Sequence, residues 1–186
     1  MAIDEALLIK QLKDPATQEA AFRTLISDYK QRLYWHIRRI VFSHDDADDV
    51  LQNTFIKIFR SIHSFKEDSK LYTWFYRIAT NESITFINAR AKNRHLDVQD
   101  YQHQLVGGLQ HDVLFNGDKI QEKLQEAIVT LPQKQQLVFN MKYFQEMKYH
   151  EISEILDTSV GALKASYFHA VKKIEKYIRA CDLNLS

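Results

Sequence analysis

The chain has few of the residues that break helices or cross-link a fold. Among 186 residues there are 4 glycines and 2 prolines. Folds built from strands and turns use more of both, so this scarcity favours an all-α protein. A single cysteine, Cys181, excludes an internal disulfide and a cage of thiolates around a metal ion. The composition therefore suits a reducing compartment.

Signals for export and for membrane insertion are also missing. The segment Met1–Glu5 has neither the basic start nor the apolar run of a signal peptide. No uninterrupted apolar stretch is long enough to span a bilayer. We therefore expect a soluble cytoplasmic protein that is not itself inserted in a membrane.

Motifs for catalysis and for metal binding are absent from the sequence. It contains no phosphate loop, no dinucleotide fingerprint and no zinc-protease motif. The 8 histidines lack ligand spacing, and Cys181 has no evident base partner. The acidic cluster at residues 45–49 lacks the glycine and the distal glutamate of a calcium loop. We predict that the chain is not an enzyme and uses no metal and no cofactor.

The charges that are present are distributed unevenly. The net charge of +1 argues neither for nor against a nucleic-acid partner, and a hydrophobic fraction of 45% is enough for a packed core. Acidic residues gather at 45–49, whereas basic residues gather near 90–94 and again from 164 to 179. A chain with one acidic and two basic surfaces can bind both a protein and a polyanion.

The remaining glycine-rich window divides the chain. Gly107, Gly108 and Gly117 fall within a stretch that has no helical periodicity, from His95 to Asp118. A structureless segment of this length is uncommon inside one compact domain. We therefore predict two small helical domains, residues 1–94 and 118–186, joined by a flexible linker at 95–117.

Hydrophobic periodicity predicts the helices of both halves. A first helix starts at Asp14–Pro15, runs through residue 29, and continues or restarts to residue 40. A second, capped by Asp45 or Asp46, runs to about residue 62, and a third, capped by Asp68 or Ser69, runs to about residue 94. In the second half, helices are expected from about 118 to 129 and from Pro132 to about 143.

The second of these helices has a polar outer face beside its apolar stripe. The face carries Asp49, Gln52, Asn53 and Ile56. Acidic residues at a helix start interact favourably with the helix dipole, so the cluster can be simply solvated. The same face could instead dock a protein.

The third helix combines aromatic residues with a polar stripe. Aromatic residues crowd around its start at Phe65, Tyr72, Trp74, Phe75 and Tyr76. The stripe follows at three- and four-residue spacing, at Arg77, Asn81, Thr85, Asn88 and Lys92. Such an arrangement can hold unstacked bases and their backbone, although most of the rings are also suited to a core. We expect Trp74 in the core and Phe65, in the preceding loop, to touch a base.

Residues 149–174 have the pattern of a helix-turn-helix. A short helix is followed by the turn Asp157–Thr158 and by Ser159, which can cap a second helix. The outer face of that second helix carries Lys164, Ala165, Phe168, His169 and Lys172. A small, polar and cationic face of this kind fits the major groove of DNA. An ordinary helical hairpin with a solvated basic face is the alternative, and we favour DNA binding.

These segments resemble a known family. Residues 46–59 and 64–81 resemble conserved region two of bacterial RNA polymerase sigma factors of the sigma-70 family, in the form typical of the extracytoplasmic-function (ECF) group. Residues 131–174, with Ser159–Lys164, resemble region four. Both blocks occur in the family's order without a region-three domain between them. The resemblance implies an alternative sigma factor that binds core RNA polymerase, directs it to promoters and helps open the DNA.

The resemblance also implies partners and site residues. The face with Asp49, Gln52, Asn53 and Ile56 would bind the clamp helices of the polymerase beta-prime subunit, and region four would meet the beta flap. The minus-ten element would be read by Ser64, Phe65, Arg77, Asn81, Asn88 and Lys92. The minus-thirty-five element would be read by Ser159, Lys164, Ala165, Phe168, His169 and Lys172. The linker would thread toward the RNA exit channel. An anti-sigma factor, which can be membrane-bound, would hold the protein inactive.

The residues also suggest two other functions. A self-standing helix-turn-helix regulator would use the first half to sense a signal or to dimerise, but it would not need the aromatic and polar stripe of the third helix. A protein-interaction adaptor would leave the outer face of the last helix unexplained. The initiation factor accounts for both features.

Overall fold

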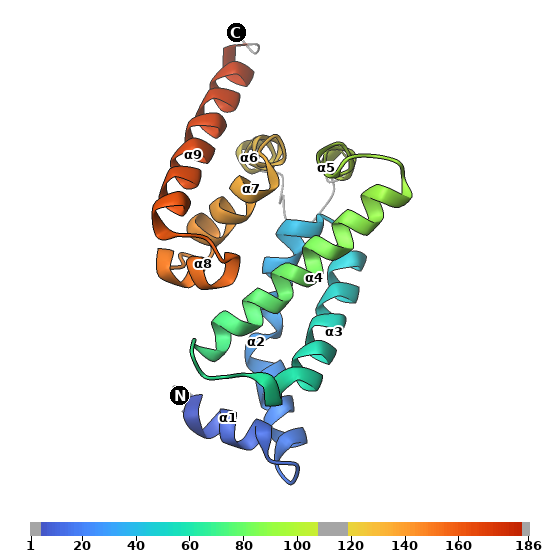
Figure 1. Cartoon of the computed structure of the whole chain (residues 1–186). Helices are drawn as coiled ribbons and strands as arrows, with labels where there is room; N and C mark the ends of the chain where they lie inside the picture. The colour runs from blue at the N-terminus through green and yellow to red at the C-terminus, as the bar shows by residue number, and fades with distance from the viewer. Residues whose placement is uncertain (1–4, 108–118, 184–186) are drawn as a thin grey trace. The chain divides into compact units, whose positions relative to one another are not determined.

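The computed structural model describes residues 5–107 and 119–183, and the regular structure of this part is entirely helical (Figure 1). The all-α prediction is therefore confirmed. The chain divides into two compact units, residues 1–85 and residues 86–186. The long helix α4, Leu71–Asn93, crosses the division, so that its last two turns belong to the second unit.

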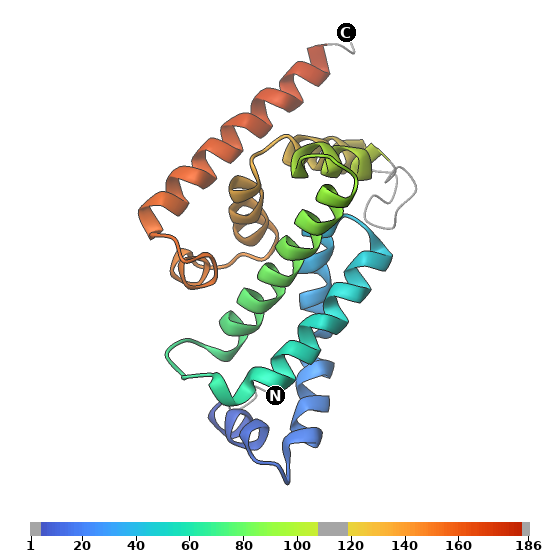
Figure 2. The same cartoon turned by 45° about the vertical axis from the view of Figure 1, so that its right-hand side comes forward.

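The first unit is a bundle of long helices. It contains α1 (Glu5–Lys13), α2 (Gln18–Val41), α3 (His44–Ser61), the short 3-10 turn η1 (Ile62–Ser64) and most of α4. In both views α2, α3 and α4 lie alongside one another (Figures 1 and 2). Buried side chains at three- and four-residue spacing form the core between them, including Leu33, Ile37, Val50, Ile58 and Phe75.

The helix starts differ in detail from those expected. Asp14 does begin a turn, because its side-chain oxygen accepts the N–H of Ala16 at 3.0 Å, but α2 itself begins only at Gln18. The cap of α3 is Ser43, whose hydroxyl accepts the N–H of Asp46 at 3.3 Å, and neither Asp45 nor Asp46 is the cap. Extended backbone at residue 43 places its short side chain against the first turn, which is the geometry of an N-cap.

The start of α4 is capped from a distant part of the chain. The N–H of Leu71 donates to the carboxylate of Glu5 at 2.7 Å, so the cap comes from α1 rather than from Asp68 or Ser69. The helix α1 lies before the first helix that the sequence predicted. Its apolar residues Leu8, Ile9 and Leu12 are buried.

The second unit contains the end of α4 and the remaining helices. These are α5 (Val98–Gly107), α6 (Lys119–Val129), α7 (Gln133–Phe139), the π-helical turn η4 (Asn140–Phe144), α8 (Tyr149–Leu156) and α9 (Val160–Leu183). Their core joins α6, α7 and α9 through Ala127, Ile128, Leu131, Phe139 and Ile174. The helices expected at 118–129 and 132–143 are therefore present.

The first part of the predicted linker is not structureless. Residues 98–107 form α5, which packs against α6 and buries Tyr101 and Gln102. The carboxylate of Asp97 accepts the N–H of Asp100 at 2.8 Å at its start. The remainder of the expected linker, residues 108–118, lies outside the described residues. None of the described helices is long and apolar enough to cross a membrane.

Candidate functional site

A tight turn sets the crossing of α8 and α9. Asp157, which ends α8, has φ 48° and ψ 51°, and its N–H donates to the carbonyl of Ser153. Aspartate is one of the few non-glycine residues that adopts this left-handed conformation readily. The next residue, Thr158, also donates its N–H to that carbonyl, at 3.3 Å. The predicted turn at Asp157–Thr158 is therefore present.

The second helix of the pair is capped and oriented as its sequence predicts. The hydroxyl of Ser159 accepts the N–H of Ala162 at 3.3 Å. Leu163 and Ile174 are buried toward α6 to α8, while Val160, Tyr167 and Val171 are half-buried. Every residue of this helix-turn-helix that is predicted to face DNA is exposed: Ser159, Lys164, Ala165, Phe168, His169 and Lys172. The structure thus brings the whole predicted set to the outer face of α9.

Aromatic rings support the cations of this face. The Lys164 ammonium lies 5.9 Å from the centroid of the Tyr149 ring, and the Lys142 ammonium lies 5.0 Å from the same ring. Burial raises the pKa of the Tyr149 hydroxyl, so this residue carries no negative charge near neutral pH. Lys172 lies 5.8 Å from the ring of Phe168, which is itself 57% exposed. Cations held on rings keep their N–H groups available to phosphates and base edges.

A loop of residues 65–70 joins η1 to α4. Just before it, Ser64 is exposed and its hydroxyl donates to the carbonyl of Ser61 at 2.7 Å. The ring of Phe65 is only 3% exposed and packs on Trp74 with the ring centroids 5.2 Å apart. Trp74 is half-buried. The expectation that the ring of Phe65 is available to touch a base is therefore wrong, because the loop turns this ring inward. Trp74 packs on Phe65 and Phe75, as expected of a core residue, although part of it reaches the surface.

The polar stripe of α4 is exposed along its whole length. Its members are Arg77, Asn81, Thr85, Asn88 and Lys92, and all are exposed. The opposite face of the same helix is buried at Phe75, Ala79, Ser83 and Ile87. The predicted stripe is therefore one continuous polar face of a single helix.

The outer face of α3 is exposed and adjoins an apolar groove. Asp49, Gln52, Asn53 and Ile56 are all exposed. Beside them lies a groove of about 610 Å³, between α2 and α3, lined by Phe22, Ile26, Gln52, Phe55, Ile56, Phe59 and Arg60. The rings of Phe22 and Phe59 meet edge to face at 4.9 Å, and Phe59 remains 40% exposed. An exposed apolar surface beside polar groups is typical of a protein-binding site.

Of the groove residues, the sequence identified Gln52 and Ile56 as part of a site, but not Phe22, Ile26, Phe55, Phe59 or Arg60. Phe22 and Ile26 have the spacing of an ordinary buried helix face, and Phe59 lies at a position that the periodicity of α3 leaves unassigned. The exposure of Ile56 and Phe59 depends on how α2 crosses α3, which no local pattern reports. Phe59, a second apolar residue on the outer face of α3 near Ile56, was the one signal for the groove in the sequence.

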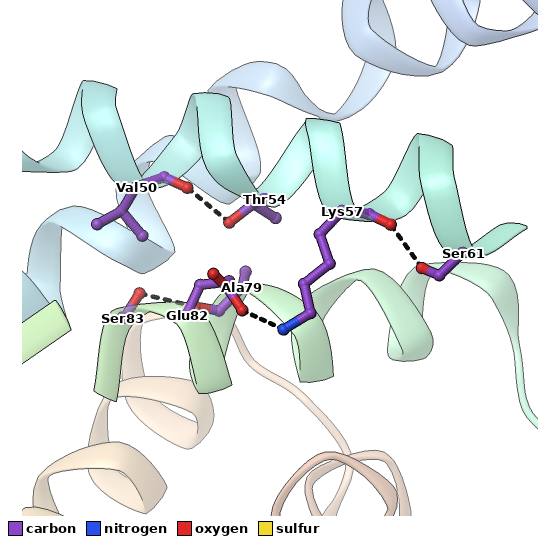
Figure 3. Close-up of polar contacts among 7 residues, drawn as sticks. All are labelled: Val50, Thr54, Lys57, Ser61, Ala79, Glu82 and Ser83. Atoms are coloured by element: carbon purple, nitrogen blue, oxygen red, sulfur yellow. Dashed lines mark hydrogen bonds and ion pairs between the residues drawn. The ribbon is translucent and has the colours of Figure 1, made fainter. Parts of the chain in front are cut away.

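An ion pair links α3 to α4. The Lys57 ammonium forms an ion pair with the Glu82 carboxylate (Figure 3). Between the two helices, the hydroxyl of Thr54 donates to the carbonyl of Val50 and that of Ser83 donates to the carbonyl of Ala79, each at 2.7 Å. Buried hydroxyls that are satisfied within their own helix allow the helices to approach closely without an unpaired group.

Within residues 5–107 and 119–183, no group of three or more His, Cys, Asp or Glu residues could hold a metal ion. The acidic start of α3 is part of an exposed helix turn. The site consists of exposed helical faces and a loop.

Comparison with known families matches both parts of the chain. Residues 25–93 match the family described as sigma-70 region 2, and residues 121–174 match the one described as sigma-70, region 4. The chain is 31% identical to the ECF RNA polymerase sigma-E factor of Haemophilus influenzae, over 92% of this chain and 98% of that protein. It is 29% identical to the ECF RNA polymerase sigma factor SigW of Bacillus subtilis, over 92% and 95% of the two chains.

Solved structures show the same fold. The structure of CnrH in complex with the cytosolic domain of CnrY superposes with a TM-score of 0.70 at 18% identity, covering 95% of this chain and 97% of that chain. The sigma factor RpoE from Bartonella quintana, in complex with the anti-sigma factor NepR, superposes with a TM-score of 0.66 at 18% identity and covers 85% and 96%.

The two matched regions, in this order and on these helices, define a bacterial transcription initiation factor of the sigma-70 class. Within that class, the chain belongs to the ECF sigma factors. It is an alternative sigma factor, which binds core RNA polymerase, directs it to specific promoters and helps open promoter DNA. A self-standing helix-turn-helix regulator is not favoured, because the region-2 match covers most of the first unit.

Proposed function

We propose that three surfaces of the chain each bind a different partner during initiation. The outer face of α3 with its apolar groove binds the beta-prime clamp helices. Residues 65–70, which we call the capture loop, receive the minus-ten element together with the stripe of α4, and the outer face of α9 reads the minus-thirty-five element. The beta flap would contact the second unit. The observation that carries this assignment is the exposure of the polar stripe of α4 and of the predicted outer face of α9, on helices whose opposite sides are buried.

The two DNA surfaces would act on different forms of the promoter. A helix with exposed Lys164 and His169 can enter the major groove of intact duplex. Asn81 offers an amide donor and acceptor to the edge of an unstacked base, and Ser64 offers a hydroxyl beside the capture loop. Phe65, which is buried, would contribute by shaping the loop, since its ring is not available for stacking. Arg77, Asn88 and Lys92 would contact the backbone of the displaced strand.

Substitutions on α9 and on α4 can separate these steps. We expect Lys164→Ala with His169→Ala to weaken closed-complex binding in a gel shift by roughly tenfold or more, because each good base contact is worth about 1–3 kcal/mol. Strand opening, once the complex is bound, should be little affected. Asn81→Ala should leave closed-complex binding largely intact and block opening in a permanganate footprint. The free energy spent on unstacking the base is then no longer offset by hydrogen bonds to the protein.

The matched control is Lys176→Ala, an exposed lysine further along α9 that is outside the predicted set. It should change neither step. A normal bubble with Asn81→Ala, or normal binding without opening in the α9 double variant, would contradict the assignment of surfaces.

Inhibition by an anti-sigma factor is a further part of the proposal. Two of the solved neighbours are complexes, CnrH with the cytosolic domain of CnrY and RpoE with the anti-sigma factor NepR. We propose that an anti-sigma factor, which can itself be membrane-bound, likewise holds this chain inactive by covering its polymerase and promoter surfaces. We also propose that the chain has no enzymatic activity of its own and acts in the cytoplasm, where core polymerase lies. A pull-down with the chain as bait should capture the anti-sigma factor. Added core polymerase should release it if the two partners compete for one surface of the chain.

A further inference from the structure

The capture loop is held at both ends by one short helix. The loop leaves η1 at Phe65 and enters α4 at Leu71. Both ends contact charged side chains of α1: Lys13 at the start of the loop and Glu5 at its end. These two residues are the last and the first of α1, eight positions apart, which corresponds to about 12 Å along a helix.

Lys13 makes three contacts with the start of the loop. Its ammonium donates to the backbone carbonyl of Phe65 at 3.0 Å and to the carboxylate of Glu67 at 2.7 Å. It also lies 5.9 Å from the centroid of the Phe65 ring. An exposed ion pair alone contributes little to stability, but a cation that also binds a backbone carbonyl restricts the path of the chain. The side chain of Lys13 is 29% exposed, so it is largely enclosed by these contacts.

The backbone between these contacts adopts an uncommon conformation. Glu67 has φ 62°, in the left-handed region that side chains other than those of glycine, asparagine and aspartate seldom adopt. Such a conformation persists only where its surroundings hold it, and the ion pair with Lys13 is a contact on the residue itself. The loop therefore depends on α1 for the shape it has here.

At the other end, Glu5 stabilises the first turn of α4. Its carboxylate accepts the N–H of Leu71 at 2.7 Å, and a negative charge is favourable at a helix N-terminus. The polar stripe begins less than two turns later at Arg77 and includes Asn81. The position of the helix start thus sets both the end of the loop and the beginning of the stripe.

We infer that α1 is a positioning element for base capture, with Lys13 and Glu5 as positioning residues that set the shape of the capture loop and thereby its choice of base. Neither residue falls within the matched region-2 segment, which begins at residue 25. A pocket returns the cost of unstacking only if its shape is fixed before the base arrives. The inference rests on the proposed base capture by the loop and α4.

The test measures base preference in single-stranded DNA directly. Holoenzyme assembled from core polymerase and the full chain is incubated with fork-junction DNA whose single-stranded nucleotides are randomised, and the retained molecules are sequenced. The wild-type holoenzyme should prefer one base at one position by roughly tenfold, the size expected of about 1–3 kcal/mol of discrimination. Lys13→Met and Glu5→Ala should each reduce that preference at least threefold, whereas co-elution with core polymerase and binding to duplex promoter stay unchanged.

Conservative variants and a neighbouring lysine provide the controls. Lys13→Arg retains a donor for the Phe65 carbonyl, and Glu5→Gln retains an oxygen acceptor for Leu71, so both should keep most of the preference. Lys10→Met removes an exposed lysine from the same helix and should keep all of it. The comparison of Glu5→Ala with Glu5→Gln tests the idea independently of how well Lys13→Met folds.

Two results would overturn the inference, and only one of them would also overturn the proposed base capture. If the wild-type holoenzyme prefers a base and both Lys13→Met and Glu5→Ala prefer it equally, α1 has only a stabilising role and the proposed capture site stands. A lowered melting temperature with unchanged preference leads to the same conclusion. If the wild-type holoenzyme shows no preference at any single-stranded position, base capture by the loop fails, and the role of α1 fails with it.

Discussion

The side-chain amide of Gln136 donates a 3.0 Å hydrogen bond to the side-chain oxygen of Gln102, and both residues are almost fully buried. The Gln136 amide also donates to the carbonyl of Leu131 at 2.7 Å. At the edge of this contact, the Gln99 amide donates to the carbonyl of Thr130 at 2.9 Å. A buried pair of amides therefore attaches α5 to α7, and the Gln99 bond attaches it to the turn between α6 and α7.

Replacing Gln136 should loosen this attachment. Gln136→Leu leaves the Gln102 oxygen and the Leu131 carbonyl buried without their partner, and each unsatisfied group costs about 1–3 kcal/mol. We expect the free energy of unfolding of the second unit to fall by about 2–4 kcal/mol. Backbone amides of α5 should exchange hydrogen faster, because an isolated helix of this length is marginal in water. Chemical denaturation and hydrogen exchange measure the two effects.

The matched control is Gln121→Leu, the same change at an exposed position of α6. It should alter the free energy of unfolding by less than about 0.5 kcal/mol. Equal stability of the two variants would show that the buried amide pair does not hold α5.

The outer face of α3 should be required for binding core polymerase. Asp49→Arg with Gln52→Arg places two long cations beside the apolar groove and reverses the charge of the face. We expect this double variant to lose co-elution with core polymerase in gel filtration, while its helical circular dichroism stays intact.

The control makes the same pair of changes on another exposed helical face. Asp28→Arg with Gln31→Arg on α2 alters the net charge equally and should still co-elute. Undiminished co-elution of the α3 variant would remove this face from the polymerase interface.

The isolated chain should bind duplex DNA weakly. Its net charge is +1, and the acidic start of α3 repels phosphates, so the cations of α9 act without support from the rest of the molecule. We expect weak binding in a gel shift, and weaker still as salt rises, because each phosphate contact releases a counterion. Tight, sequence-specific binding without polymerase would instead indicate a self-standing regulator.

Periodicity and caps were sufficient to predict the part of the site that lies on α9. Ser159 caps the helix, Leu163 is buried, and the outer residues from Lys164 to Lys172 are exposed, because a helix of regular geometry places its faces by spacing alone. The stripe of α4 was predictable for the same reason. Both depend on contacts that are close in sequence.

The parts that were not predicted depend on contacts between distant residues. Phe65 is buried because the loop folds back on Trp74 and Lys13, and α4 is capped by Glu5, 66 residues away. The helix α5 was predicted as linker because its segment is rich in Asp, Gln and His, yet its Tyr101 is buried and its Gln102 pairs with a glutamine 34 residues away. The helix propensity of a segment depends on its own residues, so it does not reveal such distant partners.

We propose that this chain gives core RNA polymerase the ability to start at particular promoters through two separate DNA surfaces. In vitro transcription tests it most directly: core polymerase is incubated with the chain on a library of genomic fragments, and transcript 5′ ends are sequenced. We predict discrete start sites that share two upstream motifs. These sites should be lost with Asn81→Ala or with Lys164→Ala and His169→Ala, and retained with Lys176→Ala. The same start sites with and without the chain, or start sites that persist in both the α4 and the α9 variants, would contradict the claim.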